Sequence, residues 1–422
     1  MCRDPRELEQ LIGFGLIELV GGGVVPGRLR ELLPSLLEPL VHPSAELRLS
    51  AAMVVGVLGE TAAGERRVAI VPETAGRLVG AGVGVLVERG AGERASFLDA
   101  AYEEAGASLG SADDVYARAD VICKVQKPAP QEVANLREGS TLVGLLQPLV
   151  NPELAQALAD RGATSFSMDT IPRITRAQSM DALSSQSTVA GYKAVLLAAG
   201  SLGKFFPMLT TAAGTIAPAR VLVLGAGVAG LQAIATARRL GAVVSAFDVR
   251  PAVKEQVESL GAAFLELDVE GAEGVGGYAV ALSEDQHARE QELIARHVAE
   301  SDAVIATALV PGKPAPVLVT EDAVQRMRPG SVIVDLAAEM GGNAQVTEPG
   351  ETIVRHAVTV IGELNLPSTM PVHASQMYSR NVWSFLTLLI KDGELVLDFE
   401  DEIVRETCVT HDGRVLKEVV AA

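Results

Sequence analysis

The feature that most constrains the fold is an apolar strand that runs directly into a glycine-rich turn. Residues 221–230 read VLVLGAGVAG, which contains a GxGxxG set. In this arrangement Gly225 permits the tight turn, Gly227 lets a pyrophosphate approach the backbone, and Gly230 lets the next helix pack closely on the strand. The segment therefore predicts a strand, a turn and a helix that together bind the phosphates of a dinucleotide.

The residues that follow the turn support this interpretation. A helix is expected over 228–240, and its free N–H groups would face the phosphates. The next strand, expected over 243–248, ends in Asp248, 23 residues after Gly225. A carboxylate here accepts hydrogen bonds from both hydroxyls of the adenosine ribose and repels the 2′-phosphate of NADP, so the predicted cofactor is NAD(H). Arg250 could weaken the exclusion of NADP. The alternative for the motif as a whole is a glycine-rich turn in an unrelated α/β protein.

Strand and helix patterns alternate along the chain and predict an α/β fold. Strands separated by helices build parallel sheets, and two such series predict two Rossmann-like, doubly wound domains with a ligand cleft between them. Long helices over 188–205 and 376–391 would join the domains, and the second would return the chain to the first domain. Strands are expected over 54–58, 83–88, 121–125, 141–146 and 164–168, and then over 220–224, 243–248, 303–306, 332–335 and 359–361.

This pattern divides the chain into three parts. The first domain is expected to comprise 53–187 and 367–422, and the dinucleotide-binding domain 188–366. Residues 1–52 differ from both, because they are leucine-rich, contain three consecutive glycines and lack the basic start and cleavage site of a secretory signal. Met53 is followed at once by a clean strand pattern, so it is the expected native start, with a short helical arm before it as the alternative.

The composition excludes several classes of protein. The formal net charge is −18, whereas a nucleic-acid partner normally requires a basic face. Three cysteines and six histidines are scattered without the spacing of a disulfide framework or a metal site. The best apolar run, 194–203, is far shorter than the roughly 20 residues that a membrane span needs. The sequence therefore predicts no nucleic-acid partner, no metal and no membrane span.

Four further stretches resemble the NAD(H)-binding domains of NAD(P) transhydrogenases. The longest, 172–187, reads PRITRAQSMDALSSQS and is similar to the cofactor loop of that family. The TAAGT of 211–215 precedes the glycine-rich turn in the family's order, and the GGYA of 276–279 resembles the tip of the family's mobile loop. A further long match, TALVPGKPAP, occupies 307–316, and the resemblance as a whole runs over about 53–413.

The resemblance assigns roles to residues of the loop. Arg173 and Ser184 would hydrogen-bond the carboxamide or pyrophosphate of NAD(H), and Asp181 would orient the ring side and the loop itself. Gln178 would bridge the nicotinamide carboxamide or ribose toward NADP(H) on a partner subunit. These four are the candidate catalytic residues, and a structural turn with satisfied polar groups is the alternative.

The candidate cofactor-binding residues come from the loop, the glycine-rich turn and the two later stretches. Tyr278 would close over the adenosine as a lid, with a solvated surface loop as the alternative, and Leu309 lies in a run that would shape the cleft. The full set is Arg173, Gln178, Ser184, Gly225, Ala226, Gly227, Val228, Gly230, Asp248, Arg250, Tyr278 and Leu309.

The same resemblance implies an activity and partners. In this family a hydride passes directly between NAD(H) on this type of chain and NADP(H) on a partner subunit, and the transfer is coupled to proton translocation. No proton leaves a substrate carbon, so the protein need only hold two nicotinamide rings in contact. The expected partners are a membrane subunit, an NADP(H)-binding beta subunit and a second copy of the chain, with a cytoplasmic location on the inner face of the cell membrane.

An amino-acid dehydrogenase of the alanine dehydrogenase type, the sister family, is the main alternative. The resemblance places Gln126 where alanine dehydrogenases have a lysine that binds the substrate carboxylate, and Gln147 where they have an acid/base histidine. Glutamine exchanges no proton near neutral pH, which argues against amino-acid oxidation. A shift in register could give Lys124 or Lys127 part of that role. An NAD(H)-sensing module is the third alternative.

Overall fold

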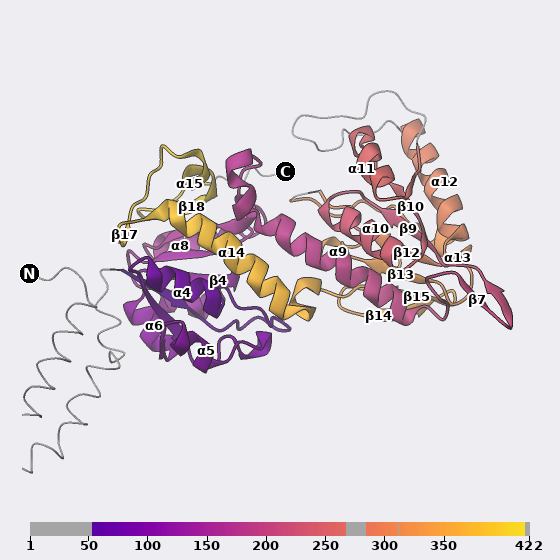
Figure 1. Ribbon diagram of the computed structural model, residues 1–422. Coiled ribbons are helices and arrows are strands. Elements are labelled where there is room, and N and C mark those ends of the chain that lie inside the picture. The colour runs from indigo at the N-terminus through magenta and orange to yellow at the C-terminus, as the bar shows by residue number, and fades with distance from the viewer. Residues whose placement is uncertain (1–52, 267–283, 311, 418–422) are drawn as a thin grey trace, which may run out of the picture. The chain divides into compact units, whose positions relative to one another are not determined.

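The computed structural model describes residues 53–266, 284–310 and 312–417 (Figure 1). The predictions made for 1–52 and for the 276–279 stretch with Tyr278 fall outside the described residues.

Eight strands form the first sheet, in the order β19-β18-β6-β5-β4-β1-β2-β3. Six of them run parallel, and β18 and β19 add an antiparallel edge beside β6. The five strands predicted for the first series are all present. The strands are β1 (Val54–Val57), β2 (Gly84–Glu88), β3 (Ser108–Gly110), β4 (Val121–Gln126), β5 (Thr141–Leu145), β6 (Thr164–Ser167), β18 (Cys408–His411) and β19 (Arg414–Val415).

Seven strands form the second sheet, in the order β11-β10-β9-β12-β13-β15-β14. All are parallel except β14, which runs antiparallel to β15 at the edge. The five predicted strands are present, and β11 and β14 were missed because their mostly exposed residues show no buried pattern. The strands are β9 (Arg220–Leu224), β10 (Val243–Phe247), β11 (Ala263–Phe264), β12 (Ala303–Ala306), β13 (Val332–Asp335), β14 (Thr352–Arg355) and β15 (Val358–Ile361).

Two small antiparallel hairpins lie outside these sheets. They are β7 (Leu209–Thr211) with β8 (Gly214–Ile216), and β16 (Ile390–Lys391) with β17 (Glu394–Leu395).

Helices cover both faces of each sheet, which confirms the predicted doubly wound α/β class. They are α4 (Pro72–Gly80), α5 (Asp99–Glu104), α6 (Ala112–Arg118), α7 (Pro130–Asn135), α8 (Pro152–Asp160), α9 (Ala182–Ser201), α10 (Val228–Arg239), α11 (Lys254–Ser259), α12 (Glu284–Glu300), α13 (Glu321–Gln325), α14 (Pro371–Leu389) and α15 (Glu402–Thr407). On the second sheet, α9, α10 and α11 share one apolar core, and α12 and α13 pack into another on the opposite face. On the first sheet, α4, α5 and α14 pack against Val55 and Val57, whereas α6 lies against Gly56 on the other face.

The predicted start of α9 was wrong. The helix begins at Ala182 rather than at 188, because the Asp181 carboxylate accepts a hydrogen bond from Ser184 N and caps the first turn. The polar run 184–187 hid this turn from a search for apolar periodicity. Its side chains make hydrogen bonds instead of apolar contacts.

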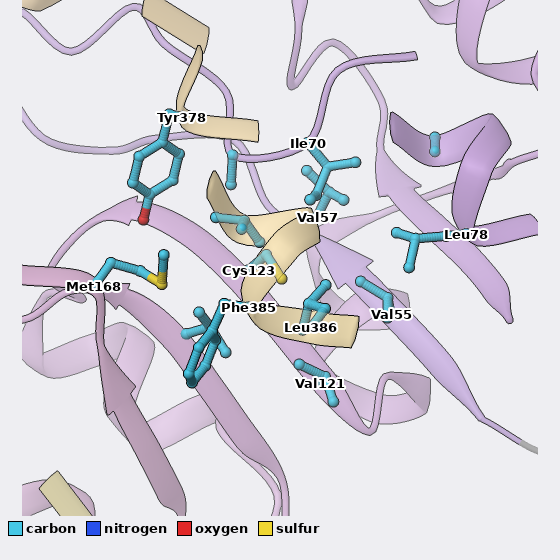
Figure 2. Packing of buried hydrophobic residues seen from close by; sticks show 14 of the residues in the cluster. Val55, Val57, Ile70, Leu78, Val121, Cys123, Met168, Tyr378, Phe385 and Leu386 are labelled. Atoms are coloured by element: carbon cyan, nitrogen blue, oxygen red, sulfur yellow. The ribbon is translucent and has the colours of Figure 1, made fainter. Parts of the chain in front are cut away.

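The helix α14 returns the chain to the first sheet, as predicted, although it begins at Pro371 rather than at 376. Proline has no N–H to lose at the first position of a helix, so it starts α14 without cost. Tyr378 and Phe385 are fully buried against β1 and β4 (Figure 2). The Tyr378 hydroxyl also donates a 2.8 Å hydrogen bond to the carbonyl of Lys124 in β4. The C-terminal helix is therefore part of the first core.

Candidate functional site

The register of the second sheet brings three strand ends together. The last residue of β9 pairs with the last residues of β10 and β12. The residues that follow, Gly225, Asp248 and Thr307, therefore meet at the carboxyl edge of the sheet. The strand order changes direction between β9 and β12, and doubly wound sheets bind ligands at such a switch point.

The glycine-rich turn lies at this switch point. Gly225 has φ of +93°, a conformation that favours glycine. A Cβ atom on Gly230 would lie 1.8 Å from the carbonyl oxygen of Gly225, so α10 can cross the turn here because glycine has no side chain. A Cβ atom on Gly227 would meet no atom within 4 Å. The space before the N-terminus of α10 is therefore open to an anion, which the free N–H groups would bind.

Asp248 is bound both to the turn and to Arg250. Its Oδ2 accepts hydrogen bonds from Ala226 N at 2.7 Å and Arg250 Nη2 at 2.9 Å. Its Oδ1 accepts hydrogen bonds from Arg250 N and Nε, both at 2.9 Å. Burial raises the pKa of Asp248, but these donors outweigh burial and hold the pKa below its usual value. Because a carboxylate has about four acceptor positions, a ribose hydroxyl must displace one of these donors to bind here.

The stretch 307–316 is held by a fully buried asparagine. Asn343 Nδ2 donates hydrogen bonds to the carbonyls of Ala308 and Pro316, each at 2.8 Å, and Oδ1 accepts one from Ala308 N at 2.9 Å. Both ends of the stretch are thereby fixed, and Leu309 between them is half exposed. No sequence pattern marks Asn343, because its role depends on contacts across the fold.

The loop 173–184 ends in two side chains that bind each other. Asp181 Oδ1 accepts a hydrogen bond from Ser184 N at 2.8 Å, and Oδ2 accepts one from the Ser184 hydroxyl at 2.6 Å. The carboxylate therefore caps α9 and orients Ser184 at once. Arg173 and Gln178 are exposed on this loop.

A cleft of about 910 Å³ joins the loop to the glycine-rich turn. Gly230 does not line it, because this residue lies beneath the turn against Gly225. Tyr278 lies outside the described residues. The predicted residues that do line the cleft are Arg173, Gln178, Asp181, Ser184, Gly225, Ala226, Gly227, Val228, Asp248, Arg250 and Leu309.

Several residues of the cleft were not predicted. Among them are Gln256 of α11, then His287, Glu290 and Gln291 of α12, and Lys313. Burial raises the pKa of the Glu290 carboxyl, and the His287 ring, 3.2 Å away, opposes that shift. Lys313 lies inside the matched 307–316 stretch and could have been chosen. The residues of α12 belong to no sequence motif. They reach the cleft because α12 packs on the second sheet.

The glutamines at the positions of the alanine dehydrogenase site do not line this cleft. Gln126 Nε2 donates a 2.9 Å hydrogen bond to Glu65 Oε2. Glu65 also forms a buried bidentate ion pair with Arg67, at 2.8 Å to Nε and 2.6 Å to Nη2. Gln147 lies at the end of β5, where its backbone N–H donates to Asp169 Oδ1 at 3.1 Å. The Arg67 guanidinium is therefore already paired with a carboxylate of the chain itself, that of Glu65.

The neighbouring lysines do not line the cleft either. Lys124 Nζ is buried 2.7 Å from Glu132 Oε1 and 3.7 Å from Glu60 Oε2. Burial raises the pKa of Glu60 to about 7, although the charge of Lys124 opposes the shift. Lys127 Nζ donates a 2.5 Å hydrogen bond to Asn151 Oδ1. A shift in register therefore places neither lysine in the cleft.

Two thiols in the described part of the chain, Cys123 and Cys408, are buried away from the cleft. Burial raises the pKa of each to about 12, so neither is a thiolate near neutral pH. Among the described residues no group of three His, Cys, Asp or Glu side chains is placed to hold a metal ion. Within the same ranges, no helix combines the length and the apolar character that a membrane crossing requires.

The fold and the site define a two-domain α/β protein whose second sheet carries a dinucleotide-type glycine turn at its switch point. The family models place it further: "Alanine dehydrogenase/PNT, N-terminal domain" matches residues 56–190, and "Alanine dehydrogenase/PNT, C-terminal domain" matches residues 194–418. The chain belongs to the alanine dehydrogenase/PNT family.

Within this family the chain is more similar to transhydrogenase subunits than to a typical alanine dehydrogenase, which confirms the predicted relationship. The first part of the NAD(P) transhydrogenase subunit alpha of Rhodospirillum rubrum is 49% identical over 375 residues, which cover 86% of this chain and 98% of that protein. The structure of a transhydrogenase from Sinorhizobium meliloti has a TM-score of 0.76 and 44% identity, and the match covers 86% of this chain and 98% of that one. The alanine dehydrogenase of Bacillus subtilis is 30% identical over 379 residues, which cover 87% of this chain and 94% of that protein.

Proposed function

We propose that the chain is the NAD(H)-binding subunit of a proton-translocating NAD(P) transhydrogenase. A hydride would pass directly between NAD(H) on this chain and NADP(H) on a partner subunit. The observation that carries the proposal is that the loop 173–184 and the turn with Asp248 line one cleft. Relatives named as transhydrogenase alpha subunits support it. The NAD(H) site would belong to a domain over 188–366, packed with a first domain over 53–187 and 367–422.

The residues of the cleft fit NAD(H). The open space before Gly227 suits a pyrophosphate at the N-terminus of α10, and Asp248 at the end of β10 suits a ribose diol and disfavours a 2′-phosphate. The volume of about 910 Å³ is within the range of about 300–1,000 Å³ that is usual for cofactor pockets. Leu309 would cover part of the cofactor at the rim, and Tyr278 would act as a lid.

The chemistry needs orientation rather than acid–base catalysis. The bound nicotinamide supplies or accepts the hydride, and the residues of this chain hold it in place. Arg173 would donate hydrogen bonds to the carboxamide or pyrophosphate. Asp181 fixes Ser184 through two hydrogen bonds, and because the Ser184 hydroxyl donates its proton to Asp181, its oxygen would accept a hydrogen bond from the carboxamide N–H. Gln178 is exposed at the cleft, where it would reach toward the partner's NADP(H).

The partners follow from the proposal. A membrane subunit would carry the proton path and a beta subunit would carry NADP(H), so the chain would lie in the cytoplasm on the inner face of the cell membrane. A second copy of the chain is the remaining proposed partner. Exposed apolar side chains on and beside the β7–β8 hairpin, Phe205, Met208 and Ile216, would suit such a contact.

The test is hydride transfer in the presence of an NADP(H)-loaded partner domain. With both nucleotides saturating, the unmodified chain is expected to support reduction of an NAD analogue by NADPH. Gln178→Ala should lower that rate by roughly 100-fold, because a small displacement of one ring costs about this much. Gln156→Ala is the matched control, since Gln156 is an exposed glutamine of α8 bound to Asp160.

Two outcomes would contradict the proposal. One is the absence of transfer by the unmodified chain, and the other is NADH production from alanine by the chain alone. The second result would favour the amino-acid dehydrogenase, which is disfavoured because Gln126 and Lys124 do not line the cleft and bind Glu65 and Glu132 instead.

Cofactor choice is tested by Asp248→Asn. Loss of the charged acceptor for the ribose should weaken NAD(H) binding by about 1.5–3 kcal/mol, or roughly 10- to 150-fold in Kd. NADPH binding should weaken less or improve, because the 2′-phosphate is no longer repelled. NADH and NADPH titrations followed by fluorescence measure both effects. Asp302→Asn is the control, since Asp302 is a buried carboxylate at the opposite edge of the same sheet. Equal weakening of both nucleotides by Asp248→Asn would contradict a role in selection.

A further inference from the structure

The segment 179–185, in which the loop 173–184 runs into α9, is tied to α14 by the buried amide of Asn381. Asn381 lies on α14 and is 7% exposed. Its Nδ2 donates a 2.9 Å hydrogen bond to the carbonyl of Ser179, and its Oδ1 accepts a 2.6 Å hydrogen bond from the hydroxyl of Ser185. Since a carbonyl can only accept, the bond to Ser179 fixes which way the amide faces.

The two partners of Asn381 lie on either side of candidate catalytic residues. Asp181 and Ser184 are between Ser179 and Ser185 in the sequence, and they bind each other through two hydrogen bonds. The amide therefore holds both ends of a short segment whose middle lines the cleft. Hydrogen bonds from Asn381 to both ends of the segment fix its position, whereas a bond to one end alone would let the segment rotate about that end.

A second buried amide, that of Gln186, adds further hydrogen bonds between this segment and α14. Gln186 Nε2 donates to Ser185 Oγ at 3.1 Å and to the carbonyl of Ala374 in α14, also at 3.1 Å. Its Oε1 accepts a 2.8 Å hydrogen bond from Arg67 Nη1. The Ser185 hydroxyl thus accepts from Gln186, and its one proton lies between two acceptors, Asn381 Oδ1 at 2.6 Å and the carbonyl of Ala182 at 3.1 Å, of which Asn381 is the nearer. Networks of this kind are rigid when every member is satisfied.

We propose that Asn381 is a positioning residue for hydride transfer, acting through Ser179 and Ser185 on the loop that carries Gln178, Asp181 and Ser184. The inference rests on the proposed function. It assigns to the C-terminal helix a role in the site, although Asn381 itself does not line the cleft. Transfer between two rings is more sensitive to small displacements than binding is, so the two should respond differently to loss of the amide.

The test compares Asn381→Asp and Ser185→Ala with the control Ser379→Ala. Aspartate keeps the oxygen that faces Ser185 but places a second oxygen against the carbonyl of Ser179. Ser185→Ala removes one hydroxyl and keeps the test open if Asn381→Asp does not fold. Ser379 is also a buried polar residue of α14, but it binds Val71 N at 3.0 Å and Thr74 Oγ1 at 2.7 Å instead of the loop.

Three quantities are measured on the full chain: the Kd of NADH, the single-turnover transfer rate to a saturating partner domain, and amide hydrogen exchange over 173–187. Asn381→Asp is expected to slow transfer by roughly 10- to 100-fold and to speed exchange in this segment, with less than about a threefold change in Kd. Ser379→Ala is expected to leave both the transfer rate and this exchange within about twofold, even where it lowers Tm.

The outcomes separate the inference from the function on which it rests. No transfer by the unmodified chain would overturn the proposed function. If the unmodified chain transfers hydride normally, and Asn381→Asp and Ser185→Ala transfer it at the same rate as the unmodified chain, the positioning role alone would be overturned. An equal loss of rate in Ser379→Ala would also overturn it, because the effect would then be a general consequence of damage to α14.

Discussion

Gly230→Ala is expected to destabilise the second domain by at least about 3 kcal/mol. The new Cβ atom would lie 1.8 Å from the carbonyl oxygen of Gly225, which is backbone and cannot rotate away. Forcing extra volume into a packed site costs typically about 1–3 kcal/mol, and a backbone clash lies at or beyond the upper end. Thermal unfolding should show a fall in Tm of about 6 °C or more.

Gly227→Ala, three residues away, is expected to have the opposite profile. Its Cβ atom meets no neighbour within 4 Å, and its φ of −76° and ψ of −167° suit an L residue. Tm should therefore change by less than about 2 °C. NADH binding should weaken by roughly 100-fold, because the methyl group takes the space in which a pyrophosphate would meet the free N–H groups of α10.

The pair of variants separates the two reasons for glycine in the turn. Tm and the NADH Kd measured on both variants distinguish a packing requirement at Gly230 from a ligand requirement at Gly227. Normal NADH affinity in Gly227→Ala would show that no phosphate approaches the turn. Unchanged stability in Gly230→Ala would show that α10 can move away from Gly225.

These two glycines also show why part of the site can be predicted from sequence. The turn, the start of α10 and Asp248 lie within one strand–helix–strand unit, so their spacing along the chain fixes their spacing in the fold. The central strands of both sheets could be predicted for a different reason, since buried parallel strands are continuous apolar runs, whereas β3, β11, β14, β18 and β19 were not predicted. The loop 173–184 was found by its resemblance to a family and not by any periodicity.

The remaining features depend on contacts between distant segments. Asn343 holds the 307–316 stretch through side-chain bonds, and Asn381 holds the loop by a bond to Ser179, 202 residues away in the sequence. Each is an ordinary asparagine in the sequence. Its role comes from burial and from hydrogen bonds to both the nitrogen and the oxygen of its side-chain amide. The same holds for Asp181, whose capping of α9 turned a polar run into the first turn of a helix.

The largest electrostatic effect is expected from the buried pair of Glu65 and Arg67. Both side chains are almost fully buried, and the Arg67 guanidinium also donates to Gln186 Oε1 at 2.8 Å and Asn365 Oδ1 at 3.0 Å. Arg67→Leu would leave the Glu65 carboxylate without its cation, which costs about 3–5 kcal/mol in buried pairs. Chemical unfolding at pH 7 measures this loss. Arg77→Leu is the control, because Arg77 forms an exposed pair with Glu73 and should cost less than about 1 kcal/mol.

The contribution of the Glu65 carboxylate to the free energy of unfolding should disappear in acid. Its dependence on pH is opposite in sign to that of Glu60. Burial alone would raise the pKa of Glu65, but the hydrogen bonds and charge of Arg67 lower it from 4.5 to about 2. A lowered pKa gives stability that is present above pH 4.5 and is lost as the pH falls toward 2, with a size of about 3 kcal/mol. Glu65→Gln should therefore be less stable than the unmodified chain at pH 7, and the difference should shrink toward pH 2.

Glu60 supplies the matched control for this titration. Burial raises its pKa from 4.5 to about 7, so its ionisation should reduce stability as the pH rises from 4.5 through 7. Glu60→Gln should flatten that part of the profile and leave the acid part unchanged, whereas Glu65→Gln should do the reverse. The free energy of unfolding, measured for the three proteins from pH 2 to 8, tests both signs. An acid profile of Glu65→Gln that parallels that of the unmodified chain would mean that Arg67 does not hold Glu65 ionised.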